Sequence, residues 1–63
     1  MTNEANLKIN IQNTITSIAE GLGADVASFY LQKHGGLSVE DISPSEYSAL
    51  YDEIFQVEAD LRD

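Results

Sequence analysis

The sequence predicts an all-α fold, a small three-helix bundle with a short helical turn before the last helix. Three observations support this prediction. Apolar residues recur at helical spacing along most of the chain, glycines interrupt that spacing at two places, and the single proline falls where a helix can begin. The chain has 63 residues, which suits one domain, so we expect residues 1–63 to form a single helical domain.

Size and composition restrict how such a fold can be stabilised. A chain this short buries only about 60% of its unfolded surface, and small domains usually add disulfides, a metal or a second subunit. There is no cysteine and only one histidine, His34, so we expect neither a disulfide nor a bound metal. Self-association or an unusually efficient helical core remains. The lack of cysteine also fits the cytoplasm, which is the location we predict.

The charge is strongly acidic and unevenly placed. Eleven acidic residues and three basic ones give a net charge of −8, which disfavours direct binding to nucleic acid or to an anionic membrane. Residues 40–63 hold eight of the acids and one base, and residues 1–39 hold three acids and two bases. We see no secretory signal and no apolar stretch that could span a membrane.

The first helix is expected to run to about Glu20. Its apolar stripe has steps of three and four residues: Leu7, Ile11, Ile15, Ile18 and Leu22. Leu7, Ile9 and Ile11 also alternate with a period of two, which is typical of a strand. We favour a helix, because a lone short strand would have no partner. The break is expected at Gly21-Leu22-Gly23, with Gly21 in the left-handed conformation that ends a helix.

The second helix is expected from Ala24 to His34, ended by Gly35-Gly36. Its apolar residues spread over more than half of the helix surface, so we expect it to be the middle layer. A short helical turn should follow from Leu37 to Ile42. Ser38 and Asp41 are spaced as a capping box, with Leu37 and Ile42 as its hydrophobic staple.

The third helix is expected from Ser43 to Arg62. Ser43 and Glu46 are spaced as a capping box, Pro44 fits the first turn, and Ile42 and Tyr47 are spaced as a staple. Its apolar face has two edges. The aliphatic edge consists of Leu50, Ile54, Val57 and Leu61, and the aromatic edge consists of Tyr47, Tyr51 and Phe55.

Together these edges cover nearly half of the helix, which is wider than one helix–helix seam requires. The first and second helices could cover both edges, or one edge could contact another chain. Glu58 falls between the edges. It could pair with Arg62 one turn later, or it could be a desolvated carboxylate that pairs with a tyrosine hydroxyl or with a partner's cation.

The outward side of this helix is expected to be an acidic surface, made of Glu46, Asp52, Glu53, Asp60 and Asp63. Such a surface usually keeps a protein soluble. It could alternatively imitate nucleic-acid phosphates and bind a protein that handles DNA or RNA, as acidic helical inhibitors from mobile elements do.

We find no pattern for catalysis, for cofactor binding or for metal binding, and we expect no enzymatic activity. His34 is interpreted as a helix-end residue. The leading hypothesis is a non-enzymatic protein–protein interaction module that self-associates, most simply as a homodimer. The expected interface residues are Tyr47, Tyr51, Phe55, Glu58, Phe29 and Tyr30. The acidic inhibitor is the alternative, and an accessory subunit of a larger complex is a third possibility.

Overall fold

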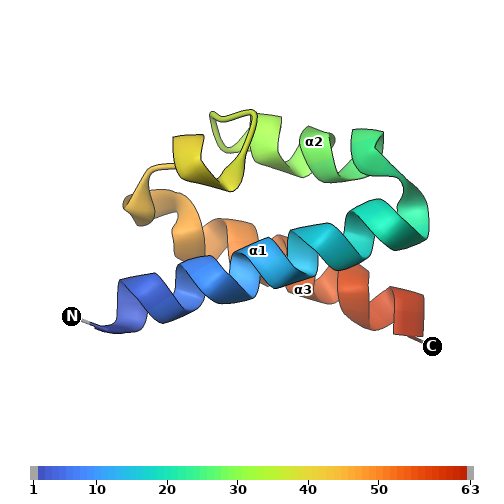
Figure 1. Cartoon of the computed structure of the whole chain (residues 1–63), viewed down its shortest axis with the longest axis horizontal. Coiled ribbons are helices and arrows are strands. Elements are labelled where there is room, and N and C mark those ends of the chain that lie inside the picture. Colours follow the sequence, from blue (N-terminus) through green and yellow to red (C-terminus); the bar gives the residue numbers. More distant parts are fainter. Residues whose placement is uncertain (1, 63) are drawn as a thin grey trace.

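The computed structural model describes residues 2–62, with side chains from residue 4 onward, and shows three α-helices and two short 3₁₀ turns (Figure 1). They follow one another as α1 (Thr2–Leu22), α2 (Ala24–Lys33), η1 (Val39–Asp41), η2 (Pro44–Glu46) and α3 (Tyr47–Arg62). No strand occurs within residues 2–62. The predicted small helical bundle is therefore confirmed, including a helix rather than a strand at Leu7–Ile11.

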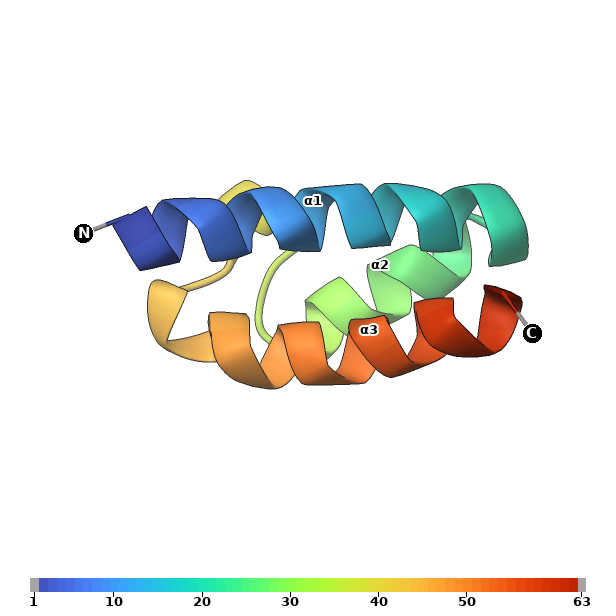
Figure 2. The same cartoon turned by 90° about the horizontal axis from the view of Figure 1, so that it is seen from below.

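The helices α1 and α3 lie side by side and run in the same direction, while α2 returns in the opposite direction on one side of the pair (Figures 1 and 2). α1 packs extensively on both other helices, whereas α2 packs much less on α3. The prediction that α2 forms the middle layer is therefore wrong. The broad apolar surface of α2 is not fully covered, and Phe29 remains 60% exposed.

The core is centred between α1 and α3. Four large side chains are completely buried, two from each of these helices: Ile11, Ile18, Leu50 and Ile54. Ala27 and Leu31 of α2 and Val39 of η1 close the core from the other side. The aliphatic edge of α3 thus supplies the core at Leu50 and Ile54, but Leu61 at the end of the helix stays 38% exposed.

The helix breaks fall at glycines, although not all at the expected ones. α1 continues through Gly21, and the backbone turns at Gly23, which has a φ of 110°. The prediction that Gly21 ends the helix is wrong. Gly21 instead lies against Leu61 of α3, where an added Cβ would be 3.0 Å from a methyl group. α2 ends as expected, with Gly35 at a φ of 99° and the Gly36 N–H donating to the Leu31 carbonyl.

The capping box predicted at the start of the third helix is absent. Ser43 makes no side-chain capping bond, and the Glu46 carboxylate is turned toward His34 instead. Pro44 does occupy the first turn, but this turn is the separate 3₁₀ turn η2, and α3 begins at Tyr47. Tyr47 is buried, as the predicted staple required.

The turn predicted between Leu37 and Ile42 is present as η1, with a different capping arrangement. The Asp41 carboxylate accepts long bonds of 3.4 Å from the Ser38 hydroxyl and from the Leu37 N–H. Ser38 makes no bond to a backbone N–H, so the reciprocal half of the box is missing. Leu37 is 73% exposed while Ile42 is buried, so the predicted staple between them does not form.

The two glycines at the end of α1 should respond oppositely to alanine. Gly23→Ala forces an alanine into a φ of 110° that only glycine adopts readily, and it should lower the free energy of unfolding by about 1–3 kcal/mol. Gly21→Ala should raise it by up to about 1 kcal/mol, because Gly21 is helical and the nearby Leu61 side chain can turn aside. Urea denaturation followed by circular dichroism measures both, and equal effects would contradict the assignment.

Candidate functional site

Each of the three basic side chains of the chain lies in an ion pair with a glutamate. Lys8 Nζ is 3.3 Å from Glu40, Lys33 Nζ is 3.1 Å from Glu53, and Arg62 is 3.5 Å from Glu58. These pairs are largely exposed, so each contributes little to stability. Within residues 4–62, every lysine and arginine therefore already has an acidic neighbour.

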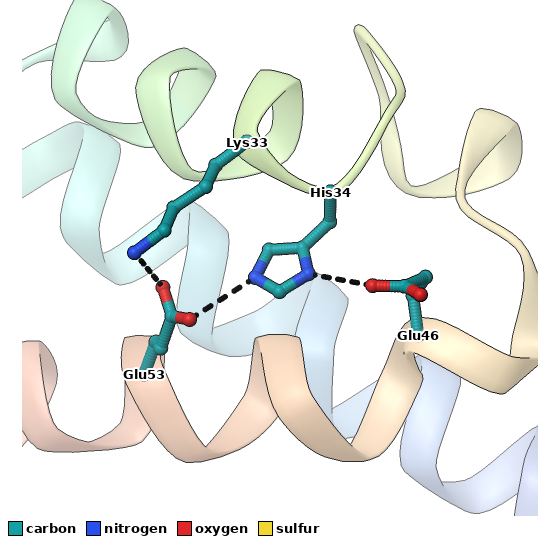
Figure 3. Close-up of polar contacts among 4 residues, drawn as sticks. All are labelled: Lys33, His34, Glu46 and Glu53. Carbon is teal, nitrogen blue, oxygen red and sulfur yellow. Dashed lines mark hydrogen bonds and ion pairs between the residues drawn. The ribbon is translucent and has the colours of Figure 1, made fainter.

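A polar cluster around a nearly buried histidine joins α2 to η2 and α3 (Figure 3). His34 follows the last residue of α2, and its side chain is 8% exposed. Its Nδ1 atom is 2.9 Å from Glu46 Oε1, and its Nε2 atom is 3.3 Å from Glu53 Oε2. The second oxygen of Glu53 is held by Lys33. These four residues are called the His34 cluster below.

The spacing of the two glutamates explains how one imidazole reaches both. Glu46 and Glu53 are seven residues apart, which places them two turns apart on the same side of the η2–α3 segment. Glu46 and Glu53, which were expected on the outward acidic surface, are partly exposed, and their carboxylates face the end of α2. Sequence reasoning missed this role, because the contacts span 12 and 19 residues along the chain.

The cluster changes the proton affinity of Glu53. The close contact with the Lys33 ammonium is the main reason that the pKa of Glu53 lies below its ordinary value, with smaller help from His34. Partial burial acts against this by disfavouring the charged form. Favourable contacts dominate, so Glu53 is more easily ionised in the folded chain than in the unfolded chain.

Three further acids were expected on the same surface. Asp52 and Asp60 are exposed, and Asp63 lies outside the described residues. Glu58, which was expected between the two edges of the helix, is half-buried and pairs with Arg62 one turn later. The local pairing expected for Glu58 is therefore confirmed.

The predicted aromatic interface residues divide into two separate groups. Tyr47 belongs to the core, at 6% exposure, and offers little surface to another protein. On α3, half-buried Tyr51 and 51% exposed Phe55 have ring centroids 5.7 Å apart. On α2, Phe29 and half-buried Tyr30 form an edge-to-face pair with centroids 5.2 Å apart.

These groups point in different directions. Residues two apart lie on opposite sides of a helix, so Phe29 faces away from Ala27 and Leu31, which line the core. By the same rule, Phe55 faces away from Glu53, which is turned toward α2. Phe55 therefore lies on the flank of α3 that α2 leaves uncovered.

The neighbouring side of α1 is polar, with no charged residue in the row from Asn6 to Ser17 and an acid, Glu20, near the end of the helix. An open hollow at the end of the α1–α3 pair is lined by Ser17, Glu20, Gly21, Glu58, Leu61 and Arg62. Three exposed asparagines lie on the same side of α1 as Ser17: Asn13, Asn10 and Asn6. They precede Ser17 by four, seven and eleven residues. We define the α1–α3 face as these asparagines with Ser17, Tyr51, Phe55, Glu58 and Arg62.

Other kinds of site find little support in the described chain. Among the described residues, no group of three or more histidines and acids is arranged to hold a metal ion. None of the helices in residues 2–62 combines the length and the apolar character that crossing a bilayer requires. A second open hollow, lined by Gln32, Gly35, Gly36, Leu37 and Asp41, does not include the His34 cluster.

Comparison of the chain with models of protein families, with curated proteins and with solved structures finds no match. The surface of the molecule itself is therefore the basis for proposing a function.

The lowered pKa of Glu53 predicts a loss of stability in acid. The contribution is fully present above the ordinary glutamate value of 4.5 and disappears as the pH falls through the lower pKa of the folded state. Glu53→Gln should make the free energy of unfolding less dependent on pH below 4.5. The control is Asp52→Asn, which removes an exposed neighbouring charge outside the His34 cluster. Urea denaturation between acid and neutral pH measures both, and identical profiles for the two variants would refute this role.

Proposed function

We propose that this chain is a non-enzymatic protein–protein interaction module that forms a homodimer through the α1–α3 face. The observation that carries the proposal is Phe55, an aromatic side chain that is 51% exposed beside half-buried Tyr51. Aromatic residues are enriched at protein interfaces, because they bury a large area with little loss of conformational entropy. Within residues 2–62, no other helix covers this flank of α3.

The distribution of charge favours a second copy of the chain as the partner. Each copy has a net charge of −8, so most orientations would bring acidic surfaces together and cause repulsion. On the α1–α3 face, the row from Asn6 to Ser17 carries no charge, and Glu58 and Arg62 neutralise each other, so that Glu20 at the end of α1 is the acid nearest to this face. Interface centres are characteristically depleted of charged residues. Two copies can therefore approach most closely through this face.

The size of the chain points in the same direction. A domain of 63 residues has a marginal core when it is alone, and a second subunit adds apolar burial. A standard interface covers roughly 800 Å² on each partner. The accessible surface of this chain is 4076 Å², so such a contact would cover about a fifth of it. The elongated α1–α3 pair provides a face of suitable length (Figure 2).

The acidic inhibitor hypothesis receives less support. Two of the five acids of the predicted acidic surface, Glu46 and Glu53, contact His34 or Lys33 of the same chain. Their carboxylates are therefore less available to a basic cleft on another protein. The ion pairing of Lys8, Lys33 and Arg62 favours a protein over a nucleic acid as the partner under either hypothesis.

Phe55→Glu should shift the dimer toward monomer, because it places two like charges in an apolar contact. We expect the dimer dissociation constant to rise by at least roughly thirtyfold, which is typical of an interface hot spot. Sedimentation equilibrium over a wide range of protein concentrations measures this change. The matched control is Phe29→Glu, the same substitution at an exposed phenylalanine on α2, which should leave the dissociation constant unchanged.

Three results would count against this dimer. They are a wild-type chain that stays monomeric at every concentration, a dimer that survives Phe55→Glu, and a dimer that both substitutions weaken equally.

Association should also depend only weakly on salt. A contact between uncharged faces gains little from electrostatic attraction, and salt screens the general repulsion between two acidic copies. Raising the salt concentration should therefore leave the dissociation constant unchanged or lower it slightly, by less than about threefold. A steep weakening with salt, seen in the same sedimentation measurement, would instead indicate a contact between opposite charges.

A further inference from the structure

His34 is placed so that both of its ring nitrogens meet carboxylate oxygens. Nδ1 is 2.9 Å from Glu46 Oε1 and Nε2 is 3.3 Å from Glu53 Oε2, on a side chain that is only 8% exposed (Figure 3). An ionised carboxylate can only accept hydrogen bonds. The geometry therefore calls for an N–H group on each side of the ring.

Only one protonation state of histidine supplies two such groups. The neutral imidazole has one N–H and one acceptor nitrogen, whereas the imidazolium donates from both nitrogens. With a neutral ring, one nitrogen lone pair would face a carboxylate oxygen. The charges agree with this reading. Lys33 and an imidazolium balance the two glutamates, while a neutral ring leaves the cluster with a net negative charge.

The position of His34 in the fold also favours the cation. The residue caps the C-terminal end of α2, where the helix dipole stabilises positive charge. The charged groups that face it are Lys33 from α2, Glu46 from η2 and Glu53 from α3. The acids of η1 are engaged elsewhere, Glu40 with Lys8 and Asp41 with Ser38.

We propose that protonated His34 is a pH-sensitive latch that fastens the end of α2 to η2 and α3. Loss of the proton removes one of the two hydrogen bonds and leaves the ring facing a carboxylate that it cannot satisfy. The apolar packing between α2 and α3 is limited, so this latch is a main connection between the two helices. The latch goes beyond the proposed dimer and does not depend on it, since Phe55 faces away from the His34 cluster.

The sign of the effect follows from the bonds. The stabilising contribution is present while His34 carries its proton, and it is lost as the pH rises and the proton leaves. We expect the folded-to-unfolded ratio to fall by about fivefold to tenfold across this change, as for the loss of one hydrogen bond to a charged group at a partly exposed site. Glu53 does not confuse the measurement, because it titrates at lower pH.

The test combines two measurements on the full chain. His34 is the only histidine, so labelling histidine with ¹⁵N gives ring signals that need no assignment and show when the proton is lost. Urea denaturation at the same pH values gives the folded-to-unfolded ratio. The wild-type ratio should fall over the pH range in which the ring signals change, and His34→Gln should remove that fall.

If His34→Gln does not fold, the latch can be tested with Glu46→Gln. This variant is expected to fold, because Glu46 is half-buried and a glutamine can still accept a hydrogen bond. It should reduce the fall in the ratio. Asp52→Asn is the matched control, since it removes one exposed negative charge outside the cluster and should leave the fall unchanged. The latch is refuted if wild type shows no fall, if His34→Gln shows the wild-type fall, or if Asp52→Asn and Glu46→Gln reduce it equally.

Discussion

The parallel packing of α1 and α3 is the contact on which the other features of this molecule depend. The completely buried Ile11 and Ile18 meet Leu50 and Ile54 there, and burial of such aliphatic side chains is the largest favourable contribution that so small a chain can obtain. Two helices of one chain can be parallel only if the connecting segment returns along their length. In this chain α2, the loop after it, and η1 and η2 make that return.

This topology leaves one side of the α1–α3 pair open. A pair of helices has two grooves, and a third helix can fill only one of them. The returning α2 occupies the groove on the side of Glu53, so Tyr51 and Phe55 lie along the other. The aromatic flank is therefore exposed because α2 can cover only one of the two grooves. A dimer would close the second groove in the way that α2 closes the first.

Electrostatics supplements this packing where the apolar contacts are thin. α2 contacts α3 less than it contacts α1, and the His34 cluster lies at that weaker junction. The basic side chains Lys8, Lys33 and Arg62 each pair with a glutamate of the same chain. The result is an uncharged row on α1, from Asn6 to Ser17, on a chain that is strongly acidic overall.

The sequence by itself determined the helices, the break at Gly35 and the excessive width of the apolar face of α3, because periodicity and backbone freedom act within one or two helical turns. The packing of the helices was needed to see that Gly21 lies within α1 against Leu61, and that Glu46 turns from its expected cap to His34. The second outcome depends on a histidine 12 residues away in the chain. Local spacing gives the direction of a side chain around its own helix, but the neighbour it meets is set by how the helices pack.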